Sequence, residues 1–278
     1  MSSRRKFLKK SIIIPSIMIL PRHVLGGKGY TSPSDKLNIA GVGVRKWGMG
    51  SGNLSSCETE NIVALCDVDH KLSAETFNKY PKAKVYKDFR VMLETQKDID
   101  AVIVATPDHT HAIISMMSIK LGKHVFCQKP LTHTVYEARV ITETARKYKV
   151  QTQMGNQGRS SEEIRRLKEW IDDGAIGPVR KVYAWTDRPV GGNPWDTFDA
   201  KAKPKEKPPI PKDLDWDLWL GPAKYRNYHP SYHPNSWRAW IDFGTGSMGD
   251  MGCHIIDPSF YALELGAPSE IQATSTHW

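Results

Sequence analysis

Short apolar runs alternate with amphipathic stretches along the first half of the chain. Helical spacing of apolar residues predicts helices over 110–121 and 134–148. Continuous apolar runs predict strands at 37–43, 62–69, 84–88, 100–107, 123–130 and 150–156. Strands that alternate with helices in this order predict an α/β fold with a doubly wound parallel sheet.

A further amphipathic stretch, residues 160–174, predicts a helix that begins with a capping box. Ser160 would cap the helix together with Glu163, and Gly174 would end it. Three apolar residues at helical spacing predict the buried face of this helix: Ile164, Leu167 and Ile171.

The pattern changes beyond Gly177. A strand-like stretch at 179–187 is followed by a Pro/Lys-rich loop at 200–212, and 270–276 again has the pattern of a strand. We therefore place a domain boundary near residue 155, with one domain at 37–155 and a second at 156–278. Because the chain ends inside or just after a strand, we expect it to be a fragment of a longer protein.

The first 27 residues have the proportions of an export signal. A basic start is followed by an apolar run at 12–20 that is too short to cross a bilayer as a helix. The stretch "SRRKFLK" at 3–9 resembles a twin-arginine signal. We expect residues 1–27 to be this signal, 28–36 to be a linker, and the protein to be periplasmic or otherwise exported through the twin-arginine machinery. An N-terminal membrane anchor is the alternative.

Composition and charge narrow the class of protein. The chain has 278 residues, 40% of them hydrophobic and 25% charged, which is typical of globular domains. A net charge of +9 could indicate a nucleic-acid partner, but the basic residues are scattered and no nucleic-acid-binding motif accompanies them, so we expect no nucleic-acid partner. The four cysteines lack the C-x-x-C spacing of a metal site. Cys66 and Cys127 lie in or beside apolar runs, where a thiol usually acts as a small buried hydrophobic group.

The first strand runs into a glycine turn typical of dinucleotide-binding folds. Gly41 and Gly43 stand where a tight turn and a close approach to a pyrophosphate are needed, whereas Lys46 occupies the third position of G-x-G-x-x-G. We expect Lys46 to begin the first helix. Asp67, at the end of the second strand, is placed to hold the adenosine ribose, which favours NAD over NADP.

The chain resembles the glucose–fructose oxidoreductase / inositol dehydrogenase (Gfo/Idh/MocA) family, in particular its exported members. The resemblance covers nearly everything after Leu37 and rests on "GVGVR", "ALCDVD", "VATPDHTHA", "CQKPLTHT", "GNQGRSSE", "DWDLWLGPA" and "GTGSMGDMGCHIID". It implies an N-terminal Rossmann domain and a C-terminal α+β domain with an open, mainly antiparallel sheet. It also implies that this sheet covers the substrate and often joins subunits, so we expect a homo-oligomer.

The family's Glu-Lys-Pro motif appears here as Gln128-Lys129-Pro130. The resemblance assigns catalysis to Lys129, Asp250 and His254, while Gln128 leaves open what balances the charge of Lys129. An unperturbed imidazole has a pKa that suits a base for a hydroxyl proton, so His254 can take this role, and Lys129 can stabilise negative charge on the reacting oxygen. If the segment is helical, Asp250 and His254 share one face.

Asp108, His109 and His111 follow the predicted strand at 100–107, whose end should face the same cleft as Lys129. They have metal-ligand chemistry, but without a further spaced ligand we favour cofactor contacts there and expect no metal. We expect His229 and His233 to belong to loop structure. The expected cofactor contacts are Gly41, Gly43, Val44, Arg45, Asp67, Thr106, Pro107, His109, His111, Gln128, Lys129 and Asn156.

Tryptophans crowd the second half of the chain. Most should pack long loops, but one or two could form the floor of a carbohydrate pocket. The expected substrate contacts are Lys129, Trp237, Arg238, Asp250 and His254.

These features predict an NAD(P)-dependent oxidoreductase that acts on a sugar or polyol hydroxyl, with a tightly held nucleotide. Two alternatives remain. One is an NAD-dependent glycosidase that works by transient oxidation and elimination. The other is a non-catalytic carbohydrate-binding protein with the same fold.

Overall fold

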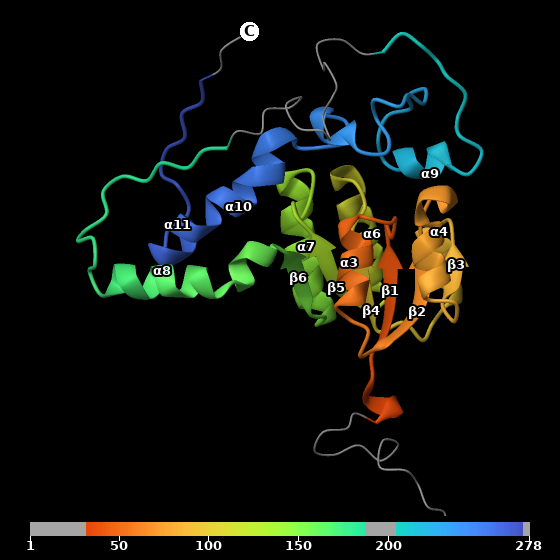
Figure 1. Ribbon diagram of the computed structural model, residues 1–278, viewed down its shortest axis with the longest axis horizontal. Coiled ribbons are helices and arrows are strands. Elements are labelled where there is room, and N and C mark those ends of the chain that lie inside the picture. Colours follow the sequence, from red (N-terminus) through yellow and green to blue (C-terminus); the bar gives the residue numbers. More distant parts are fainter. Residues whose placement is uncertain (1–31, 187–203, 275–278) are drawn as a thin grey trace, which may run out of the picture. The chain divides into compact units, whose positions relative to one another are not determined.

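A six-stranded parallel sheet forms the centre of the first half of the protein (Figure 1). The computed structural model describes residues 32–186 and 204–274. The strand order is β3-β2-β1-β4-β5-β6, and all neighbouring strands are parallel. This order confirms the predicted Rossmann-type sheet. The strands are β1 (Asn38–Val42), β2 (Asn61–Cys66), β3 (Lys84–Tyr86), β4 (Ala101–Val104), β5 (His124–Gln128) and β6 (Thr152–Gly155).

Helices connect the strands and bury both faces of the sheet. Successive residues of β1 belong to different buried clusters, Ile39 to one and Ala40 to the other, as the alternation of side chains along a strand requires. Burial on both faces explains why the strands are continuously apolar. The helices of this half are α3 (Met49–Ser55), α4 (His70–Lys79), α5 (Phe89–Thr95), α6 (Asp108–Lys120) and α7 (Val135–Tyr148).

The helix α8 (Glu162–Asp172) confirms the amphipathic prediction but not its capping box. Its N-cap is Ser161, with no side-chain cap hydrogen bond, because Ser160 ends the short 3-10 helix η2 (Gln157–Ser160). Gly174 does end the helix as predicted. It adopts φ 74°, and the amides of Gly174 and Ala175 donate to the carbonyls of Ile171 and Trp170.

The second half consists of short helices joined by long loops. The strands predicted at 179–187 and 270–276 are absent from their described parts, 179–186 and 270–274. A strand exists only in a hydrogen-bonded ladder, and neither segment finds a partner strand among the described residues. The expected antiparallel sheet is therefore not seen there. The elements are α9 (Trp216–Leu220), η3 (Ser236–Ala239), η4 (Met248–Gly252, a π-helical turn), α10 (Cys253–Ile255) and α11 (Asp257–Ala262).

A buried aromatic cluster attaches these loops to the sheet. The amide of Asp215 donates to the carbonyl of Val68 beyond β2, and the amide of His109 donates to the carbonyl of Phe243. The loops therefore cover the carboxyl edge of the sheet, and most of their tryptophans pack, as expected. The cluster consists of Leu214, Trp216, Trp219, Leu220, Tyr232, Trp237, Trp240 and Phe243.

By its contacts the chain divides into two units, Met1–Lys36 and Leu37–Trp278. In the first, the structure describes only the stretch that contains the 3-10 helix η1 (Pro33–Asp35). The predicted signal, residues 1–27, lies outside the described residues. Within 32–186 and 204–274, no helix combines the length and the apolar character needed to cross a membrane.

Candidate active site

The glycine turn after β1 lies against the end of β4, at the point where the strand order reverses. Gly43 has φ 80°, and a Cβ there would lie 2.7 Å from the carbonyl carbon of Ala105 and 2.8 Å from the amide nitrogen of Thr106. A side chain cannot be accommodated at this point. In open α/β sheets this crevice between diverging strands is where ligands bind.

The third glycine of the motif is Gly50. A Cβ on Gly50 would lie 2.0 Å from the carbonyl oxygen of Gly43, which is the close helix–strand contact that the third glycine permits. The expectation that Lys46 takes this position and begins the first helix is wrong, because α3 begins at Met49. An additional turn, closed by the Gly48 amide on the Arg45 carbonyl, separates the two parts of the motif.

Asp67 follows β2 and lies beside this turn. Its Oδ2 accepts from the amide of Val44 at 2.8 Å, and its Oδ1 accepts from the amide of Asp69 at 3.0 Å. Burial raises the pKa of Asp67, although these hydrogen bonds act in the opposite direction. The carboxylate that was expected to hold a ribose therefore also fixes the glycine turn.

Lys129, directly after β5, forms a largely buried ion pair with Asp250 of η4. Its Nζ donates to Asp250 Oδ1 at 2.6 Å and to the Asp250 carbonyl at 2.8 Å, and the two side chains are 12% and 17% exposed. Arg238 Nε lies 3.3 Å from the same Oδ1. Asp250 thus balances the charge of Lys129 in place of the carboxylate that Gln128 lacks.

Two side-chain amides line the same edge of the sheet. Gln128 Nε2 donates to Asn53 Oδ1 of α3 at 2.8 Å, and Asn156 Nδ2 donates to the carbonyl of Cys253 at 2.8 Å. Gln128 Oε1 and Asn156 Oδ1 are buried and have no hydrogen-bond partner among the described residues. A buried acceptor without a donor is costly, so both oxygens suit a ligand that carries N–H or O–H groups.

Two family models match almost the whole chain beyond residue 36. Residues 37–156 match the NAD-binding Rossmann fold of the Gfo/Idh/MocA oxidoreductase family, and residues 160–276 match its C-terminal alpha/beta domain. The chain belongs to the Gfo/Idh/MocA oxidoreductase family.

Known members of the Gfo/Idh/MocA family are similar to large parts of the chain. D-glucoside 3-dehydrogenase of Escherichia coli (strain K12) is 30% identical over 214 residues, which are 77% of this chain and 50% of that protein. Levoglucosan dehydrogenase of Pseudarthrobacter phenanthrenivorans is 24% identical over 218 residues, 77% of this chain and 45% of that protein. The chain spans about half the length of these curated relatives.

A solved structure shares the arrangement of the chain. The oxidoreductase domain protein from Kribbella flavida superimposes with a TM-score of 0.58 at 25% identity, covering 82% of this chain and 54% of that one.

The residues of this Gfo/Idh/MocA chain fit a dinucleotide. Gly43 lets the turn pack closely against the end of β4 at the crevice, and Gln128 and Asn156 offer unpaired acceptors at the ends of β5 and β6. Further contacts would come from the expected residues around the glycine turn and the end of β4: Gly41, Val44, Arg45, Asp67, Thr106 and Pro107.

His109 is not available to a cofactor. Its ring is 4% exposed, and its two nitrogens lie 3.1 and 3.2 Å from the carbonyls of Trp219 and Phe243. The aromatic cluster covers the ring, so the cofactor contact that we expected from His109 is wrong. Burial also lowers the pKa of His109 to about 4. His111 is also buried, with its nitrogens 2.7 Å from the carbonyls of Thr106 and Pro130. Instead of contacting the cofactor as expected, His111 joins the segments that follow β4 and β5.

The side chains with metal-ligand chemistry in this region are each engaged in other contacts. Asp108 accepts from the hydroxyl and the amide of Thr245. Throughout the described ranges, no three His, Cys, Asp or Glu side chains are grouped as a metal site requires. His229 and His233 belong to loop structure: His229 contacts Ser231, and His233 contacts Asp69.

The structure changes the expected substrate contacts at Trp237. Its ring is only 6% exposed and lies 4.2 Å beneath the Arg238 guanidinium, so Arg238 rather than the indole faces outward. Asp250 and His254 lie in the consecutive helical turns η4 and α10, as the helical expectation requires.

Two residues of the site were missed from the sequence. Gly50 was not assigned to the motif, because the additional turn separates it from Gly43. Asn53, the partner of Gln128, carried no sequence signal, because its role depends on how α3 packs beside β5.

Proposed function

We propose that this protein oxidises or reduces a CH–OH group of a sugar or polyol with a bound nicotinamide dinucleotide. The observation that carries the proposal is the Lys129–Asp250 ion pair at the carboxyl edge of the sheet, beside the glycine turn. The relatives named above, a glucoside dehydrogenase and a levoglucosan dehydrogenase, support a carbohydrate substrate.

The dinucleotide, when bound, supplies hydride transfer. Lys129 Nζ donates a hydrogen bond to the reacting oxygen and stabilises negative charge on it. Asp250 directs the ammonium, because it accepts from Nζ through a carboxylate oxygen and a carbonyl. His254 takes the hydroxyl proton on its imidazole, and Arg238 restrains Asp250 from the other side.

Lys129→Ala and His254→Ala test these roles. Each should lower kcat by about 10²- to 10⁴-fold, and His254→Ala should leave nucleotide affinity, measured by calorimetry, within about twofold of the parent protein. Lys123→Ala, which removes a half-buried lysine directly before β5 whose ammonium donates to the Lys97 carbonyl, is the control and should leave both quantities unchanged. Full activity in both site variants would refute the roles, and carbohydrate binding without any turnover in the parent protein would favour the carbohydrate-binding alternative. Aglycone release without net NADH would favour the glycosidase.

We propose NAD as the preferred cofactor, since the Asp67 carboxylate lies at the end of β2, where a 2′-phosphate would be repelled. The dissociation constant for NADP should exceed that for NAD at least about tenfold. Comparable constants for both nucleotides would refute this preference.

We also propose that residues 1–27 direct export through the twin-arginine machinery, that 28–36 form a linker, and that the protein assembles as a homo-oligomer. The domains would be 37–155 and 156–278, in agreement with the ranges of the two family models. Replacing Arg4 and Arg5 together with lysine should retain the full-length protein in the cytoplasm on cell fractionation, and unchanged export would refute the signal.

A further inference from the structure

The additional turn in the glycine motif places a tryptophan in an unfavourable position. Trp47 is the third residue of the turn that runs from Arg45 to Gly48, and its φ is 59°. This left-handed region favours glycine or asparagine at that position of a turn. The indole is also 83% exposed, so burial does not compensate for the strained backbone. Backbone strain without packing gain points to a function for the side chain.

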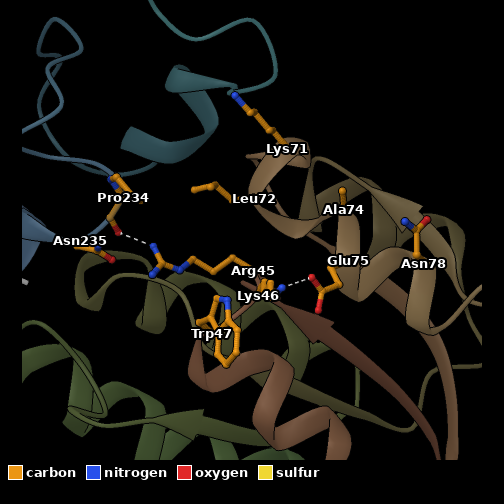
Figure 2. A pocket seen from close by; sticks show the side chains of 10 residues that line it. All are labelled: Arg45, Lys46, Trp47, Lys71, Leu72, Ala74, Glu75, Asn78, Pro234 and Asn235. Atoms are coloured by element: carbon orange, nitrogen blue, oxygen red, sulfur yellow. Dashed lines mark hydrogen bonds and ion pairs between the residues drawn. The ribbon is translucent and has the colours of Figure 1, made fainter.

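Lys46 holds this turn against α4 and also contacts the indole ring. Its amide donates to the carbonyl of Leu72 at 3.1 Å, and its ammonium pairs with Glu75 (Figure 2). The same ammonium lies 5.0 Å from the centre of the Trp47 ring, within the range of a cation–π contact. Lys46, in the additional turn, therefore steadies one side of an otherwise exposed aromatic ring.

A pocket of about 650 Å³ opens between this turn and α4 (Figure 2). It lies beside the end of β2, where Asp67 marks the adenosine side of a dinucleotide site. Its walls combine apolar surface from one aromatic ring and aliphatic side chains with two side-chain amides and three cations. The lining residues are Arg45, Lys46, Trp47, Lys71, Leu72, Ala74, Glu75, Asn78, Pro234 and Asn235.

We propose that this pocket receives the purine base of the dinucleotide, with Trp47 as the stacking wall and Lys46 as the residue that positions it. The inference rests on the proposed function. A purine offers a flat π-face for the indole and polar edges for the amides of Asn78 and Asn235. Stacking of a base on an aromatic side chain contributes roughly 5- to 150-fold in affinity.

Calorimetry of the full-length protein with 5′-AMP and with nicotinamide mononucleotide tests the stacking wall. Trp47→Gly should weaken AMP binding about tenfold and leave mononucleotide binding unchanged. Its Tm should rise by about 2 °C or more, because glycine suits the turn. Trp47→Phe should keep most of the AMP affinity. The matched control is Trp170→Phe, because Trp170 is also an exposed tryptophan but lies on α8, away from the pocket.

Fluorescence gives a second readout, because AMP should quench Trp47. The quenching should disappear in Trp47→Phe and persist in Trp170→Phe. Lys46→Met should weaken AMP binding about threefold through loss of the cation–π contact, and Lys46→Arg should restore it. Unchanged AMP affinity in Trp47→Gly would overturn the inference alone, provided that the parent protein binds NAD. A parent protein that binds neither NAD nor NADP would overturn the proposed function and this inference together.

Discussion

Two histidines on α6 stand two positions apart and have opposite shifts of pKa. Burial lowers the pKa of His109 to about 4. Burial also acts against the charged form of His111, but Cys127, Asp108 and the Pro130 carbonyl outweigh it and raise the pKa to about 9. The geometry of His111 supports the charged form, since two carbonyls at 2.7 Å both require an N–H donor and a neutral imidazole has only one.

Because His111 is charged in the folded protein, the free energy of unfolding should fall at alkaline pH. Its folded pKa lies above the unfolded value of about 6.5, so its contribution is complete below that pH and is lost as pH rises through about 9. Urea unfolding at intervals from pH 6 to pH 10 should show a loss of up to about 3 kcal/mol that is absent in His111→Met.

His109→Gln is the matched control for the alkaline slope. It should keep that slope, because His109 is already neutral above pH 6.5. It should instead reduce the loss of stability between about pH 6.5 and pH 4, where the unfolded chain binds a proton that folded His109 does not. An identical alkaline slope in His111→Met and the parent protein would contradict the assignment.

At the scale of elements, the close packing of α3 on the glycine turn can be tested with two glycines of one helix. Gly50→Ala places a Cβ against the Gly43 carbonyl and should lower the free energy of unfolding by about 2 kcal/mol or more, with loss of NAD binding. Gly52→Ala meets no atom within 4 Å and should stabilise the helix by about 0.5–1 kcal/mol. Equal effects of both substitutions on urea unfolding would refute Gly50 as the third glycine.

The elements that the sequence predicted correctly are those whose burial is fixed by the sheet itself. The six strands follow continuous apolar runs, and α6 and α7 follow helical patterns, because they belong to the sheet and the layers on it. The exception is α8, which shows its predicted amphipathic pattern although it packs on α11. The turn at Lys46 was misplaced because motif spacing assumes a fixed loop length. The strands expected at 179–187 and 270–276 depend on partner strands far along the chain, which local pattern does not specify.

In the candidate site, too, the sequence predicted residues correctly but not their long-range contacts. Lys129 and Asp250 were both expected from the family resemblance, but their ion pair was not, since it joins residues 121 positions apart. His109 was expected at the cofactor and is instead covered by Phe243 and Trp219, because the aromatic loops fold back over α6. Sequence pattern names residues of the right chemistry, whereas long-range packing decides which of them remain accessible.

At the scale of the whole molecule, loops of the second half cross the adenosine side of the site. Arg45 Nη1 donates to the carbonyl of Pro234 at 3.1 Å, and His233 Nε2 lies 2.9 Å from Asp69 Oδ2. Burial opposes ionisation of Asp69, yet His233 and the Leu72 amide together lower its pKa. These contacts join the glycine turn and the end of β2 to a segment more than 160 residues away.

The crossing loop should therefore slow release of a bound nucleotide. We expect full-length protein to retain nucleotide through purification, as mass spectrometry of the denatured supernatant would detect. His233→Ala removes one crossing contact and should speed release during dialysis about tenfold, since a lost hydrogen bond to a charged group is typically enough for that change. His229→Ala, whose partner Ser231 lies within the same loop, should release nucleotide at the parent rate. Equal release from both variants would mean that the glycine turn alone holds the nucleotide, independently of the second half of the chain.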